Sequence, residues 1–94
     1  MVTAIVLMKV ERSEVDHVAQ RLVVLEGVTE VFSVAGRMDL VALLRAPTNE
    51  AIGGVVTKEI RAIKGITETE TLMAFRVFSD YDLERMFSIG IEKK

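Results

Sequence analysis

The stretch GVTEVFSV, residues 27–34, recurs in altered form as GITETETL, residues 65–72. Both copies place a glycine, a β-branched aliphatic residue, a threonine and a glutamate in the same order. Each copy also follows a stretch with apolar residues at helical spacing, VAQRLVVLE before the first copy and VVTKEIRAIK before the second. The similarity therefore covers a supersecondary unit, and it predicts a chain built from two related halves.

The first half opens with VTAIVLMKV, residues 2–10, whose β-branched and apolar residues predict a strand buried on both faces. Ser13, with Asp16 three residues later, predicts the N-cap of a helix that ends at Gly27. The apolar face of this helix consists of Val15, Val18, Ala19, Leu22 and Val23. A second strand is predicted over VTEVFSVA, residues 28–35.

The second half starts with a short connection, GRMD at residues 36–39, and a strand, LVALLRA at residues 40–46. This close spacing predicts an antiparallel hairpin with the preceding strand. Pro47 and Thr48 predict the start of a second helix, which ends at Gly65. Its apolar face consists of Ile52, Val55, Val56, Ile60 and Ile63.

Gly53 and Gly54 lie inside this second helix, where each costs roughly 1 kcal/mol relative to alanine. We expect the two glycines to permit a close backbone approach. The fourth strand is predicted over residues 66–78.

The length of 94 residues predicts one domain, residues 1–94, with its core over about 2–78. A short C-terminal helix is predicted over residues 80–88, and residues 91–94 form a tail.

The element order βαββαβ predicts an α+β, ferredoxin-like fold. In this fold a four-stranded antiparallel sheet carries both helices on one face, with the first and third strands in its centre. The sequence agrees, because these two strands are apolar on both faces whereas the second and fourth carry threonine, serine and glutamate.

The other face of such a sheet is bare, although the first strand places Ile5 and Leu7 on it. Half of the residues are hydrophobic, and the mean hydropathy is +0.34. At ~25 cal/mol per Å², leaving a few hundred Å² of apolar sheet in water forfeits several kcal/mol. We therefore predict that two chains pack sheet against sheet as a homodimer.

Composition excludes several classes of function. The chain contains no cysteine, which rules out disulfides, thiolate metal sites and cysteine nucleophiles. Its net charge is −2 and its basic residues are scattered, so we predict no direct binding of nucleic acid. No apolar run approaches the ~20 residues that span a bilayer, and the N-terminus lacks the features of a signal peptide, so we expect a cytoplasmic protein without a membrane partner.

The titratable residues predict no enzyme, no cofactor and no metal site. His17, the single histidine, lies on the polar face of the first helix, where a solvated side chain is the ordinary interpretation. Asp80 and Asp82 fall at a helix start, where the helix dipole favours acidic residues. Dispersed carboxylates with one histidine do not form a convergent ligand set.

Two short motifs remain as candidates for binding. In GRMD, Gly36 frees the backbone to approach a ligand, and the Asp39 carboxylate is suited to an ammonium group. In TETET, strict alternation places Thr67, Thr69 and Thr71 on one face of the last strand. Each motif alone is also explained by ordinary turn and edge-strand preferences.

Taken in order, AIVLMKV, LEGVTEVFSVAGRMDLVALLRA and IKGITETETLMAF resemble the effector-binding domain, or RAM domain, of the Lrp/AsnC transcription regulators. The most specific part is the hairpin VAGRMDLV followed by KGITETET. The resemblance implies sheet-to-sheet dimers that assemble into higher oligomers, with an amino acid bound at contacts between dimers.

By this resemblance, the ligand-binding residues are Gly36, Arg37, Met38, Asp39, Thr69 and Thr71. Asp39 would hold the α-ammonium group, while threonine hydroxyls and backbone amides take the carboxylate. Met38 replaces the aromatic residue that the family has before the hairpin aspartate. Because the first strand starts at Val2, we expect a stand-alone effector domain without a helix-turn-helix domain, which senses an amino acid by itself or co-assembles with a full-length regulator.

Three alternatives remain. A small dimeric α+β-barrel enzyme, of the cofactor-free monooxygenase or isomerase type, requires a polar constellation between helices and sheet. An ACT-type amino-acid-binding domain has a glycine between its first strand and first helix, and KVERSE contains none. A purely structural oligomerisation module predicts the same interface, so only a ligand screen separates it from an effector domain.

Overall fold

The computed structural model describes residues 1–78. The C-terminal helix predicted over residues 80–88, which includes Asp80 and Asp82, and the tail at residues 91–94 lie outside the described residues.

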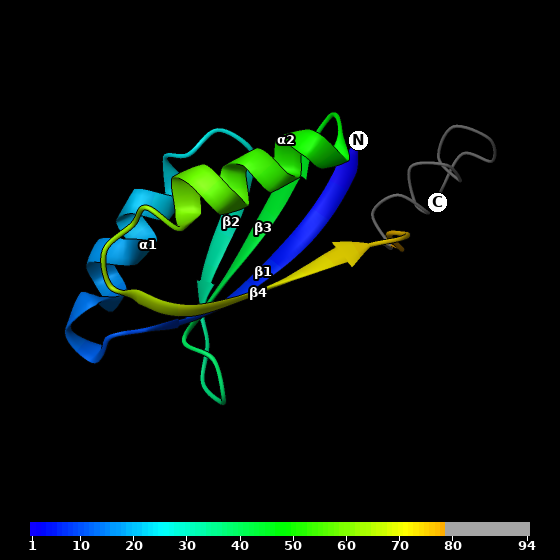
Figure 1. Ribbon diagram of the computed structural model, residues 1–94. Helices are drawn as coiled ribbons and strands as arrows, with labels where there is room; N and C mark the ends of the chain where they lie inside the picture. Colours follow the sequence, from blue (N-terminus) through cyan, green and yellow to red (C-terminus); the bar gives the residue numbers. More distant parts are fainter. Residues whose placement is uncertain (79–94) are drawn as a thin grey trace, which may run out of the picture.

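One sheet and two helical segments form the described part of the chain (Figure 1). The 3-10 turn η1 precedes the first helix, and the π-helical segment η2 continues the second. In chain order the elements are β1 (Val2–Val10), η1 (Arg12–Glu14), α1 (Val15–Val23), β2 (Val28–Ser33), β3 (Leu40–Ala46), α2 (Asn49–Gly54), η2 (Val55–Ile60) and β4 (Ile66–Ala74).

The strands lie in the order β2-β3-β1-β4, and every neighbouring pair is antiparallel. Both helical segments lie on the same side of the sheet (Figure 1). The predicted α+β, ferredoxin-like fold and its two central strands are therefore confirmed. The short β2–β3 connection and the two helical crossovers produce this order.

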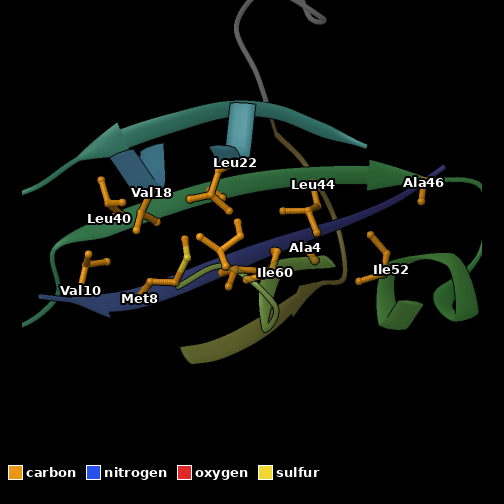
Figure 2. Close-up of a cluster of buried hydrophobic side chains, with 13 residues drawn as sticks. Ala4, Met8, Val10, Val18, Leu22, Leu40, Leu44, Ala46, Ile52 and Ile60 are labelled. Atoms are coloured by element: carbon orange, nitrogen blue, oxygen red, sulfur yellow. The ribbon is translucent and has the colours of Figure 1, made fainter. Parts of the chain in front are cut away.

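The core lies between the helices and one face of the sheet (Figure 2). Side chains from alternate positions of β1 and β3 meet side chains from both helical segments there, as period-two and period-3.6 patterns require. The residues that are completely buried are Ala4, Val6, Met8, Val18, Leu22, Leu40, Ala42, Leu44 and Ile60. No charged or polar residue among those described is buried.

The start of the first helix differs from the prediction. Ser13 lies inside η1 and provides no cap, because the Glu14 amide donates to the Glu11 carbonyl at 2.8 Å and a backbone turn forms instead. Val23 is also 53% exposed and does not belong to the apolar face. The start of the second helix is confirmed, since the Ala51 amide donates to Thr48 Oγ1 at 3.1 Å.

Two strands are shorter than predicted. β2 ends at Ser33 instead of residue 35, because the Val34 amide donates to the Asp39 carbonyl at 3.0 Å and begins the turn there. β4 ends at Ala74 instead of residue 78. Ala74 pairs with Thr3 near the start of β1, so little neighbouring strand remains beyond it.

The repeated tetrapeptide makes the same contacts in both halves of the chain. Gly27 and Gly65 have φ angles of 97° and 107°, and each follows its helix by several residues, so each ends the connection and not, as predicted, the helix itself. The Gly27 carbonyl accepts from the Arg45 amide at 2.8 Å, and the Gly65 carbonyl accepts from the Glu11 amide at 2.9 Å.

The threonine of each copy lies in an irregularity of the sheet. The strand register shifts across Thr29 in β2 and across Thr67 in β4, leaving both without a paired residue. Thr29 Oγ1 donates to the Leu43 carbonyl, and Thr67 Oγ1 donates to the Lys9 carbonyl, each at 3.2 Å. The repeat therefore encodes a glycine, a β-bulge and a threonine that attach each edge strand to its central neighbour.

Candidate functional site

The connection between β2 and β3 projects from one end of the sheet (Figure 1). At its base, the Asp39 amide donates to the Met8 carbonyl at 2.9 Å. The Asp39 carboxylate accepts from the Val10 amide at 2.8 Å through Oδ2. Asp39 therefore attaches the hairpin to β1 through both its backbone and its side chain.

The remaining hairpin residues differ in exposure. Gly36 has a φ of 134° and no atom within 4 Å of the position that a Cβ would take, so its backbone is open to a ligand. Arg37 is exposed, whereas Met38 is only 9% exposed. Gly36, Arg37 and the half-buried Asp39 carboxylate therefore present the accessible polar surface of this hairpin. A carboxylate offers about four lone-pair sites, so the bond to Val10 leaves Asp39 able to accept further donors.

The threonines of β4 lie on the helix side of the sheet. Thr69 and Thr71 pair with Met8 and Val6, whose side chains are buried beneath the helices. Glu68 and Glu70 pair with Lys9 and Leu7 on the opposite face. The predicted alternation is confirmed for these four residues. Thr67 departs from it, because it occupies the bulge.

The six predicted ligand-binding residues form two groups in one chain. Met8 lies in register between Leu40 of β3 and Thr69 of β4, so the hairpin base and the threonine flank β1 on opposite sides. Strands are about 4.8 Å apart, which separates β3 from β4 by about 10 Å. None of the four hairpin residues lines either hollow beside β4.

These hollows are lined in part by residues to which the sequence analysis assigned no binding role. One, of about 740 Å³, includes Thr71 and is lined from the helical side by Ile52 and Gly53. The other, of about 470 Å³, includes Thr69 and Arg61. In the sequence, the feature that pointed to these hollows was the pair Gly53 and Gly54 inside the second helix. No atom of residues 1–78 outside the helix lies within 4 Å of a Cβ built at either glycine, so the expected close backbone approach is wrong.

Residues 1–78 contain no group of three or more histidine, cysteine, aspartate or glutamate side chains placed to hold a metal ion. His17 is exposed on α1. None of the helices within that range is long and apolar enough to cross a membrane.

This combination of a ferredoxin-like sheet with an exposed glycine-aspartate hairpin is typical of a small regulatory ligand-binding domain. Residues 3–83 match the family model described as the Lrp/AsnC ligand binding domain. The chain belongs to this family.

Two curated relatives are HTH-type transcriptional regulators of uncharacterised function. One, from Pyrococcus furiosus, is 37% identical over 59 residues, and another, from Pyrococcus horikoshii, is 40% identical over 59 residues. Each alignment covers 63% of this chain and 39% of the relative. The matched region thus spans about two fifths of each regulator.

Two solved structures have the same fold. The crystal structure of TTHA0845 from Thermus thermophilus is 40% identical, with a TM-score of 0.79 over 84% of this chain and 99% of that one. The feast or famine regulatory protein from M. tuberculosis, complexed with L-methionine, is 26% identical. Its TM-score is 0.72, over 85% of this chain and 54% of that one.

Proposed function

We propose that this chain is an effector-binding and oligomerisation domain that binds a small amino acid and takes part in transcription regulation in the cytoplasm. The family match, the regulators among its relatives and the M. tuberculosis complex with L-methionine support this proposal. The single observation that carries it is the exposed hairpin, where a carboxylate and an open glycine backbone lie together.

In the proposed site, Asp39 accepts the α-ammonium group of the ligand. Gly36, Arg37 and Met38 form the hairpin wall, and Thr69 and Thr71 supply hydroxyls for the carboxylate. Because the two groups are separated within one chain, the site is completed by residues from neighbouring chains. Ligand binding then favours the assembled state, since the complete site exists only there.

The bare face of the sheet supports a homodimer as the first level of assembly. Ile5, Leu7 and Leu43 are half-buried on this face in the single chain, and Leu72 is 43% exposed. A second copy packed sheet against sheet removes this apolar area from water. The same surface accepts a full-length Lrp/AsnC regulator as a co-assembly partner.

Non-enzymatic action is part of the proposal. The space between the helices and the two central strands, where an α+β-barrel enzyme holds its polar groups, is filled by apolar side chains in the described residues. The proposed effect on transcription is therefore indirect, through assembly.

The experiment is light scattering with a parallel thermal melt, using L-methionine first and then each other standard amino acid. We expect one of them to change the mass of the particle and raise its melting temperature. The discriminating variant is Asp39→Asn, which keeps an oxygen to accept from Val10 while removing the charge. Asp16→Asn, at an exposed carboxylate on α1, is the matched control.

Asp39→Asn should lose the response to that amino acid by about tenfold or more, because a charged acceptor is replaced by a neutral one. Asp16→Asn should respond like the wild-type protein. An Asp39→Asn protein that binds the same amino acid with unchanged affinity contradicts the proposed site, and a mass that no amino acid alters contradicts the proposed function.

A further inference from the structure

Among the described residues, no helix packs closely over the helix side of β4, whereas α1 packs against β2. α1 packs against β2 and β3, whereas α2 packs against β3 and β1. As a result, Thr71 is exposed and Met73 is 42% exposed on the helix side of β4, although their register partners on β1 are buried. Two hollows lie in this space, and both are lined by Val56 and Thr57. We call these two adjoining hollows between α2–η2 and β4 the β4 groove.

The two ends of the β4 groove differ in chemistry. At one end, Ile52, Met73 and Phe75 are among the lining residues, and apolar side chains predominate. At the other end, the lining contains the Arg61 guanidinium together with Thr67 and Thr69. A guanidinium beside a hydroxyl is suited to a carboxylate, and the apolar end is suited to a hydrocarbon chain.

The helical wall of the groove carries two features that cost stability. Gly53 lines the groove inside a helix, and a Cβ at this position would meet no atom within 4 Å. Glycine in a helix interior is unfavourable relative to alanine, and no packing among residues 1–78 offsets this cost. η2 follows directly as a π-helical segment, a form that occurs frequently at functional sites. An empty position and an irregular helix on the same wall indicate that the wall is shaped for a ligand.

The described lining of the groove contains one cationic side chain, Arg61, and one acidic side chain, Glu68. The register partner of Glu68 is Lys9, which lies with Ile5 and Leu7 on the opposite face of the sheet. We therefore expect the carboxylate of a ligand to bind at Arg61.

We propose that the β4 groove binds an apolar carboxylic acid, with its headgroup at Arg61 and Thr69 and its hydrocarbon chain along Thr71 and Met73. All four named residues of this site lie in one chain, and the site does not use the hairpin. It shares Thr69 and Thr71 with the proposed effector site, so β4 contributes to the binding of two classes of ligand. Arg61 directly follows η2, and Thr69, Thr71 and Met73 belong to β4.

The first test is calorimetric titration of the full chain with octanoate, octanamide and 2-aminooctanoate. Octanoate should bind, and octanamide should bind about tenfold more weakly or worse, because the charge facing Arg61 is lost. 2-Aminooctanoate should bind no more tightly than octanoate. Absence of octanoate binding, or tighter binding of the amino acid, overturns the proposal.

The second test locates the site with matched variants. Arg61→Gln should weaken octanoate binding by about tenfold or more, while Lys64→Gln, at an exposed cation outside the groove lining, should leave it unchanged. Gly53→Leu should block the groove, because Gly53 lines it. Gly54→Leu is the control, because Gly54 lines a separate hollow outside the β4 groove. Both leucines have room, since neither position has an atom within 4 Å.

Equal octanoate affinity in the Gly53→Leu and wild-type proteins overturns the proposal. Asp39→Asn separates it from the proposed function, because this variant should bind octanoate normally while losing the amino-acid response. If octanoate fails to bind but an amino acid still changes the mass of the particle, the groove is refuted and the proposed function remains. The reverse result refutes the proposed function alone.

Discussion

The two halves of this chain begin their edge strands in the same way and then diverge. In both, a glycine with positive φ, a bulge and a threonine hydroxyl join the edge strand to a central strand, with nearly identical hydrogen-bond lengths. After that, β2 continues into the exposed hairpin that ends at Asp39, whereas β4 continues as an edge with an open helix side.

The helices show the same contrast. α1 is a regular α-helix whose buried residues cover β2 and β3. α2 contains Gly53 and Gly54 and passes into the π-helical η2, and it leaves β4 uncovered. This difference indicates that the repeated residues form the scaffold. The residues that differ between the two halves line the surfaces where we propose that ligands bind.

The largest expected effect comes from the repeated glycines, which are alike in backbone but not in surroundings. At Gly65, a Cβ would lie 2.8 Å from Glu14 Cβ, whereas at Gly27 the nearest atom is 3.4 Å away. Both positions have positive φ, which strains alanine. Gly65→Ala should therefore cost about 3 kcal/mol of unfolding free energy and Gly27→Ala about 1.5 kcal/mol. Urea denaturation measures both, and equal losses would show that the halves are equivalent.

The hairpin has no counterpart in the second half of the chain. Substitutions of Asp39 test whether the stability of the protein depends on the contact between the hairpin and β1. Asp39→Ala removes the acceptor of the Val10 amide, a charge-assisted bond, and should cost about 2 kcal/mol. Asp39→Asn keeps an acceptor and should cost less than about 1 kcal/mol. Thermal melts of the two variants compare them, and an Asp39→Ala protein as stable as wild type would show that the contact contributes nothing.

The smallest expected loss of unfolding free energy is the same in both halves of the chain. Thr29→Val and Thr67→Val each remove one hydroxyl-to-carbonyl bond while keeping a β-branched side chain. Each should cost about 0.5 kcal/mol, because both bonds are exposed. Chemical denaturation of the pair sharpens the comparison. A cost in one half and none in the other would mean that the repeated contacts are not equivalent.

Much of the scaffold could be predicted from the sequence, because its signals are local. Continuous apolar runs in residues 2–10 and 40–46 identified the central strands, and Thr48 identified a helix start. Contacts between distant segments could not be predicted in this way. The bulges at Thr29 and Thr67 arise from the pairing register, and the end of β4 depends on where β1 begins.

The candidate site shows the same division. GRMD was recognisable because the family resemblance placed a ligand there, whereas its glycine and aspartate alone are ordinary turn residues. The bond from Val10 to the Asp39 carboxylate joins residues 29 positions apart, so no local pattern predicts it. Arg61 was overlooked, since a single arginine near a helix end is ordinary until the opposite strand is placed.

The most direct test of the account is an amide NMR map of the full chain, recorded as each standard amino acid is added. We predict that one amino acid shifts the signals of Gly36 to Asp39 and of Thr69 and Thr71, while the repeated segments at residues 27–29 and 65–67 change little. Shifts confined to the repeated segments, or no shifts with any amino acid, would contradict the claim that the residues breaking the repeat carry the function.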